Sequence, residues 1–130
     1  MTELAGGVLL DEKGRVLLLH RNTQWLKQWQ LPGGKVEPDE SPADTVAREL
    51  KEELGIDVQT LEQIGIGKFE QTGKAYRYSW FSVQQTDPRQ KPQVLEADHD
   101  KCEYFSLQEI KLMPDASPNL LKLANLLEAK

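Results

Sequence analysis

The feature that most constrains this fold is a helix signal over residues 41–55. Ser41 is a favoured N-cap, and Pro42 suits the first helical position, where its missing N–H has no partner to lose. Gly55 suits the left-handed position that follows the last turn. The residues between recur at the spacing of one apolar helix face: Ala43, Val46, Ala47, Leu50 and Leu54. The spacing predicts an amphipathic helix that packs its apolar face into a core.

The opposite side of this helix carries three carboxylates, Glu49, Glu52 and Glu53. They fall within an arc of roughly 100° at the 3.6-residue helical period, and like charges at this spacing destabilise a helix. A divalent cation would reverse that repulsion, and hard oxygen ligands suit Mg²⁺ or Mn²⁺. A solvated acidic face has the same pattern, so the helix taken alone leaves both interpretations open.

Apolar and alternating runs on both sides of the helix predict strands. Residues 25–34 predict a Trp-containing loop that ends in Pro-Gly-Gly, and residues 86–101 predict a long polar loop. A second amphipathic helix is expected to begin at Ser117-Pro118. The order of elements predicts an α/β fold with a mixed sheet packed between helices. The expected strands are 4–10, 15–20, 58–69, 75–85 and 103–106, with turns at 11–14 and 72–74.

Length and composition restrict the class of protein. The 130 residues fit one domain, 1–130. The excess of 21 acidic over 16 basic residues gives a net charge of −5, which disfavours a nucleic acid polymer as partner. A single cysteine, Cys102, excludes an intrachain disulfide. We expect a cytoplasmic protein with no membrane partner, since no apolar run approaches the roughly 18–20 residues of a membrane span and the first residues do not resemble a secretory signal.

The residues that follow Gly34 resemble the Nudix box, G-x5-E-x7-R-E-U-x-E-E-x-G-U. The match over 23 residues has no departure and consists of Gly34, Glu40, Arg48, Glu49, Leu50, Glu52, Glu53, Gly55 and Ile56. The resemblance implies a Nudix α/β/α sandwich whose loop-helix-loop box holds Mg²⁺. It also implies hydrolysis of a nucleoside diphosphate linked to another group, by attack of water at phosphorus.

The resemblance implies roles for individual box residues. Glu52 and Glu53 would be metal ligands, and Glu49 a ligand or the general base. The backbone at Gly33 and Gly34 would supply a further ligand.

Basic residues complete the set of candidates. By the resemblance, Arg48 belongs to the catalytic set and orients a box carboxylate, while Glu40 pairs with it. Lys35 is a candidate phosphate contact, although a solvated lysine explains it equally well. Arg21 and Arg77 are further candidate phosphate contacts by their charge.

Some Nudix enzymes use one more carboxylate from a loop outside the box. We expect Asp98 or Glu96 to fill this role and include Asp98 in the metal set. His99 in the same stretch is interpreted as a loop residue without metal-ligand company, and His20 as a strand-end residue. The acidic candidates of this stretch are Glu96, Asp98, Asp100 and Glu103.

The segment 113–117, Met-Pro-Asp-Ala-Ser, is similar to the F-P-x-A-N element of MutT-type 8-oxo-dGTP hydrolases, with Ser117 in place of Asn. We therefore favour a small-molecule nucleotide substrate, a (d)NTP cleaved to a monophosphate and pyrophosphate. The alternatives are hydrolysis of ADP-ribose, a nucleotide sugar or a dinucleoside polyphosphate, and a non-catalytic nucleotide-sensing domain. The oligomeric state, monomer or homodimer, stays open. Candidates for base stacking, each also explained by core packing, are Trp25, Trp29, Tyr76, Tyr78, Trp80 and Phe81.

Overall fold

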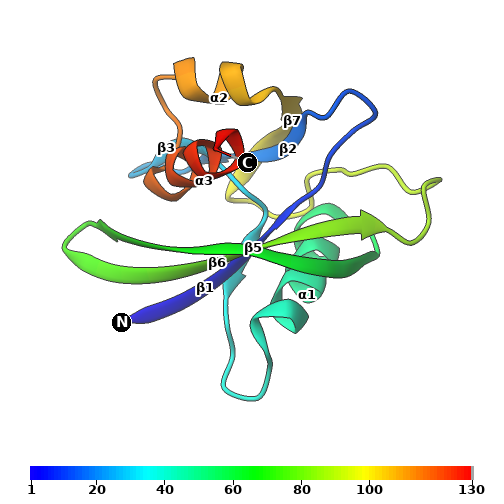
Figure 1. Cartoon of the computed structure of the whole chain (residues 1–130), viewed down its shortest axis with the longest axis horizontal. Coiled ribbons are helices and arrows are strands. Elements are labelled where there is room, and N and C mark those ends of the chain that lie inside the picture. The colour runs from blue at the N-terminus through cyan, green and yellow to red at the C-terminus, as the bar shows by residue number, and fades with distance from the viewer. Residues whose placement is uncertain (130) are drawn as a thin grey trace.

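The computed structural model describes residues 1–129, which form an α/β fold (Figure 1). None of the helices in this part of the chain is long and apolar enough to cross a bilayer. The elements in chain order are β1 (Thr2–Val8), β2 (Val16–Asn22), β3 (Lys27–Gln30), β4 (Gly33–Lys35), α1 (Pro42–Leu54), β5 (Val58–Gln71), β6 (Lys74–Gln85), β7 (His99–Phe105), α2 (Leu107–Leu112) and α3 (Pro118–Glu128).

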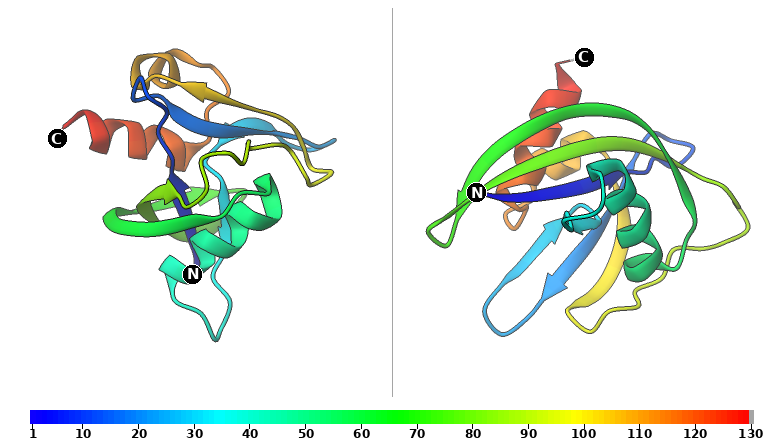
Figure 2. Two further views of the ribbon diagram at one scale, coloured as in Figure 1. Left: turned by 90° about the vertical axis from the view of Figure 1, so that its right-hand side faces the viewer. Right: turned by 90° about the horizontal axis from the view of Figure 1, so that it is seen from below.

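The strands form two sheets. The larger is mixed and has the order β4-β1-β6-β5, in which β1 runs parallel to β6 and antiparallel to β4. The smaller is antiparallel and has the order β3-β2-β7. Helix α1 lies on one side of the mixed sheet and α3 on the other, as the views in Figures 1 and 2 agree. The expected sandwich, with a mixed sheet between helices, is therefore confirmed, and the second sheet is an addition to it.

Two hydrophobic clusters occupy the two sides of the mixed sheet. Strand β6 contributes to both, because successive side chains of a strand point to opposite faces. Tyr78 and Trp80 belong to the cluster beneath α2 and α3, whereas Phe81 and Val83 belong to the cluster beneath α1. These aromatic side chains are thus part of the core, while Trp25 is 87% exposed.

Helix α1 begins and ends where its local signals predict. The Ser41 hydroxyl accepts a hydrogen bond from the Asp44 N–H at 3.1 Å, and the Asp44 carboxylate accepts from the Ser41 N–H at 3.4 Å. Gly55 adopts φ of 72°, a left-handed conformation that a side chain disfavours, and its N–H donates to Lys51. Val46, Leu50 and Leu54 of the apolar face are completely buried, whereas Ala43 and Ala47 are partly buried.

The segment from 25 to 34 differs from the expected loop, because it contains β3 and β4. Strand β3 pairs with the preceding β2 as a hairpin, and β4 pairs with the distant β1. With four and three residues, neither strand is long enough to produce a readable alternation. The expected hairpin around residues 11–14 has its turn, since the Gly14 N–H donates to the Asp11 carbonyl. However, β1 and β2 belong to different sheets. The two segments pair next to the turn, through an isolated bridge between Leu10 and Val16.

Two further differences lie in the second half of the chain. Strand β7 begins at His99, so the polar loop is shorter than expected. Helix α2 was not expected, although Ser106 and Glu109 cap its first turn reciprocally, a signal visible in the sequence. With six residues, this helix is too short to show a helical period. The second expected helix, α3, does begin after the N-cap Ser117.

Candidate functional site

Strand β4 places the backbone of two glycines, Gly33 and Gly34, against the acidic face of α1. The Gly33 N–H donates to Glu53 Oε1 at 2.7 Å. Gly34 lies so close to the Glu49 carboxylate that a Cβ at this position would overlap it. Only glycine permits this approach, which places the backbone of residues 33–34 and two helix carboxylates in one small region.

Arg48 organises the carboxylates at the edge of this region. Its Nε and Nη2 donate to both carboxylate oxygens of Glu40, at 3.1 and 2.6 Å. Its Nη1 donates to Glu49 at 3.1 Å and to Glu52 at 3.2 Å. The two-pronged guanidinium contact, with a hydrogen bond from Thr45, lowers the pKa of Glu40 to about 2. Arg48 therefore fixes the direction of Glu49 and Glu52 through a pair that stays ionised.

Glu53 is the most buried of the helix carboxylates, with 3% of its surface exposed. Burial raises the pKa of Glu53 well above its ordinary value, and the charges of Glu49 and Glu96 raise it further. The Gly33 hydrogen bond opposes this shift. Burial also raises the pKa of Glu49. The site thus gathers negative charge where water solvates it poorly, and a compact cation would relieve that cost.

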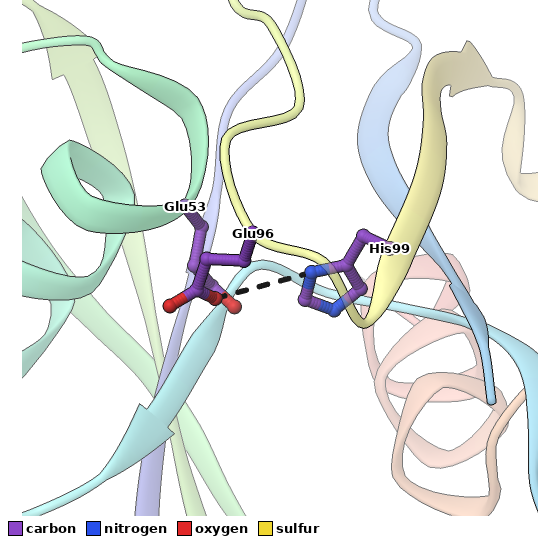
Figure 3. Close-up of side chains that lie close together, drawn as sticks. All are labelled: Glu53, Glu96 and His99. Atoms are coloured by element: carbon purple, nitrogen blue, oxygen red, sulfur yellow. Dashed lines mark ion pairs between the residues drawn. The ribbon is translucent and has the colours of Figure 1, made fainter.

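Glu96, from the loop before β7, joins Glu53 at this point (Figure 3). One ligand atom from each of Glu53, Glu96 and His99 lies within 4.8 Å of the others. The expectation that His99 is a loop residue without such company is wrong, because His99 is the first residue of β7 and is buried against these acids. No sequence pattern around His99 predicts its place in the structure. The pairing of β7 with β2 brings His99 next to the acidic site.

The remaining candidates lie in different surroundings. Asp98 is exposed, and its carboxylate lies 3.7 Å from Arg21, whereas Glu96 is the loop acid beside Glu53. Arg77 forms an ion pair with Glu3 at the start of β1. His20 lies within β2, and its Nδ1 lies 2.7 Å from Asp100.

A cavity of about 150 Å³ adjoins the glycine pair. It opens between the two sheets and combines apolar walls with several carboxamides and one guanidinium, that of Arg21. Its other lining residues are Leu4, Gln28, Gln30, Leu31, Gly33, Gly34, Phe69, Gln71, Tyr78 and Asn119.

A larger hollow, of about 960 Å³, lies on another side of the molecule between β5, β6 and the elements α2 and α3. Aliphatic side chains dominate its walls, and Glu62 is the ionisable residue among those that line it. Because it gathers no group of titratable side chains, the chemistry is assigned to the acidic site on α1.

The donor set of the acidic site fits a divalent cation. Carboxylate and carbonyl oxygens are the ligands of Mg²⁺ and Mn²⁺, and the buried charge of Glu53 lacks a cationic side chain at hydrogen-bond distance among residues 1–129. Fold and site together define an α/β/α sandwich with a divalent-cation site where a glycine-containing strand meets a helix. The NUDIX domain family model matches residues 3–126. The chain therefore belongs to the Nudix family.

Individual relatives agree with this assignment. CTP pyrophosphohydrolase of Escherichia coli (strain K12) is 36% identical over 75 residues, covering 55% of this chain and 56% of that protein. 8-oxo-dGTP diphosphatase of Proteus vulgaris is 40% identical over 57 residues, covering 42% and 51%. The chain thus spans about half the length of these curated relatives. The crystal structure of the MutT protein from Methanosarcina mazei Go1 superposes with a TM-score of 0.81 at 30% identity, covering 99% of this chain and 96% of that one.

Proposed function

We propose that this protein hydrolyses a nucleoside triphosphate to the monophosphate and pyrophosphate, with Mg²⁺ as cofactor and Mn²⁺ as a substitute. The observation that carries the proposal is the buried carboxylate of Glu53, held by the Gly33 N–H at 2.7 Å beside a cavity that contains a guanidinium. Such a site offers oxygen ligands for a cation on one side and a cavity of about 150 Å³ on the other. The net charge of −5 supports a small nucleotide, rather than a polymer, as substrate.

The metal would be held by Glu52, Glu53, the Gly34 carbonyl and a loop carboxylate, with Glu49 as ligand or base. When bound, the metal neutralises phosphate charge and helps to stabilise the charge that develops in the transition state. Glu96 lies closer to this set than Asp98, which supports Glu96 as the loop carboxylate.

In the proposed reaction, water attacks a phosphorus atom, its proton passes to a carboxylate, and pyrophosphate leaves. Glu49 suits the role of base because burial raises its pKa, bringing it closer to neutral pH than an exposed glutamate. Arg48 holds the Glu49 carboxylate through a hydrogen bond of 3.1 Å. Arg21 lines the cavity and would bind a phosphate; Lys35, which is exposed, and Arg77, paired with Glu3, have weaker support.

The cavity supports recognition of a nucleobase. Ser117 stands where an asparagine was expected for a MutT-type enzyme, but Asn119, two residues later, brings a carboxamide to the cavity wall. The Ser117 hydroxyl donates to Asn119 Oδ1 at 2.6 Å, which orients that amide. Carboxamides can make paired hydrogen bonds with a base edge. The names of the two curated relatives, which refer to CTP and 8-oxo-dGTP, point in the same direction.

A substrate panel tests the proposal. The protein is incubated with Mg²⁺ and each of the common and oxidised (d)NTPs, ADP-ribose, a nucleotide sugar and a dinucleoside polyphosphate, and the products are separated by ion-exchange chromatography. We expect a monophosphate and pyrophosphate in equal amounts from at least one triphosphate. Turnover of ADP-ribose without turnover of any triphosphate would refute the substrate class. Binding without turnover of any compound would favour a nucleotide-sensing domain.

A further inference from the structure

A row of carboxamides leads from the cavity to His99. Gln71 Nε2 donates to Gln28 Oε1 at 3.4 Å, and Gln28 Nε2 donates to Gln30 Oε1 at 3.3 Å. The Nε2 atom of Gln30 then lies 3.1 Å from Nε2 of His99. Every amide in the row gives its N–H to the next acceptor, so the row ends on a donor that faces the imidazole.

The direction of this row selects one tautomer of His99. An amide N–H needs a lone pair on its partner, so Nε2 of His99 accepts and the ring proton resides on Nδ1. A ring nitrogen that accepts a hydrogen bond carries no proton, so a ring whose Nε2 accepts from Gln30 is neutral. A neutral ring has one N–H, which leaves Nδ1 as the donor.

The Nδ1 atom of His99 points at the acidic site. It is buried and has no hydrogen-bond partner among residues 1–129, and 2% of the His99 side chain is exposed. Glu96 Oε1 lies 4.0 Å away, about 1 Å beyond an ordinary hydrogen bond (Figure 3). A buried donor without an acceptor costs free energy, and a small movement of the half-exposed Glu96 side chain would remove that cost.

We propose that His99 is a positioning residue, which holds the Glu96 carboxylate beside Glu53 through a hydrogen bond from Nδ1 and is itself oriented by Gln30. The protonated Nδ1 cannot ligate a metal, because a ligating nitrogen needs its lone pair. One oxygen of Glu96 accepts from His99, and the other is left for the cation. The inference rests on the proposed metal-dependent function for its purpose, but the tautomer and the metal affinity can be measured without any substrate.

The first experiment determines the tautomer in the metal-free wild-type protein. Long-range ¹H–¹⁵N correlation spectra distinguish a protonated from an unprotonated ring nitrogen, and the sequence has two histidines, His20 and His99. A His20→Asn variant assigns the signals by elimination. We expect the proton of His99 on Nδ1. A proton on Nε2 overturns the proposal and makes His99 a candidate ligand instead. Gln30→Met removes the selecting donor and should shift the ring toward a mixture of tautomers.

The second experiment measures Mn²⁺ binding by electron paramagnetic resonance. His99→Leu removes the donor and should weaken Mn²⁺ binding about 10- to 100-fold, the usual effect of losing a hydrogen bond to a metal ligand. His99→Asn keeps an N–H donor near the Nδ1 position and should restore most of the affinity. His20→Asn is the matched control, because His20 pairs with Asp100 and not with the acidic site.

Turnover provides a final readout if a substrate is found. His99→Leu should then lower kcat and leave the nucleotide KM almost unchanged, because His99 does not line the cavity. Unchanged Mn²⁺ affinity in a folded His99→Leu variant overturns the proposal. If that variant does not fold, the tautomer of the wild-type ring still decides. Failure of every nucleotide to react would refute the proposed function and leave both of these tests intact.

Discussion

Replacing Glu53 with Gln separates two effects of the buried carboxylate: its destabilisation of the metal-free fold and its contribution to metal binding. Glutamine has nearly the same shape and keeps an oxygen that can accept the 2.7 Å hydrogen bond from the Gly33 N–H. The substitution removes a negative charge that is 3% exposed and close to Glu49 and Glu96. Removing the desolvation cost of a buried carboxylate that has no cationic partner at hydrogen-bond distance is worth about 1–3 kcal/mol. At roughly 4 °C per kcal/mol for a domain of this size, Tm should rise by about 4–12 °C without metal.

The increase in Tm caused by Glu53→Gln should grow as pH rises. The pKa of Glu53 is raised by burial, so ionisation destabilises the wild-type protein as pH rises from the ordinary value of 4.5 through the raised value. Below pH 4.5, Glu53 is protonated in both the folded and unfolded states, and the charge-related difference disappears. The advantage of Glu53→Gln should therefore be absent in acid and grow with pH. Thermal unfolding from pH 4 to 8 in a chelating buffer measures it.

Added Mg²⁺ should reverse the order of stability. The wild-type Tm should rise with Mg²⁺ concentration, because a ligand that binds only the folded state stabilises it. Glu53→Gln should lose most of this response, and kcat should fall by a few orders of magnitude. Glu52→Gln is the matched control for metal-free stability, since the Glu52 side chain is half-exposed and its charge has a small desolvation cost. A Glu53→Gln variant that is less stable than wild type throughout, or whose difference does not vary with pH, would refute the reasoning.

Three further substitutions test the geometry of the site. Gly34→Ala should lower kcat by about 100-fold, since its Cβ would displace the Glu49 carboxylate and small misplacements have effects of this size; kinetics with a parallel Tm measurement checks this, and normal kcat contradicts it. Arg48→Lys should raise the pKa of Glu40 from about 2 toward 4.5, because lysine cannot make the two-pronged contact; carbon-detected NMR titration measures the shift. In wild type, the stability from this pair is present above pH 4.5 and is lost as pH falls toward 2. Arg21→Ala should raise the nucleotide KM about tenfold, or 1.4 kcal/mol, and an unchanged KM would exclude Arg21 from phosphate binding.

The parts of the structure that could be predicted are those encoded by neighbours in the chain. Helix α1 was predicted to the residue because its caps, Ser41 and Gly55, and its apolar face are all local signals. The hairpin between β5 and β6 was predicted for the same reason, since Gly73 lies between two long strand-forming runs. The fixed spacing of the box also predicts that Glu49 and Glu53 lie at one site, since both fall on the same face of α1.

The parts that could not be predicted depend on contacts between distant segments. Strand β4 is three residues long and exists because β1 offers it an edge. His99 reaches Glu96 and Glu53 because β7 pairs with β2, a relation that no local periodicity records. The choice between Asp98 and Glu96 was likewise beyond the sequence, because neighbouring acids in a polar loop differ only in the direction that the backbone gives them.

Strand β1 also determines where the glycine pair, Gly33 and Gly34, lies relative to the acidic site. It pairs Ala5 with Gly34 along one edge and is hydrogen-bonded to β6 along the other, so the position of the glycine pair relative to α1 is set by sheet register. A slip of one residue would turn every side chain of β4 to the opposite face. The Gly33 N–H would then no longer meet Glu53, and the bulk of Lys35 or Val36 would come toward the carboxylates. Insertion of a single residue within β1 should therefore disable the site even in a protein whose two hydrophobic clusters still assemble.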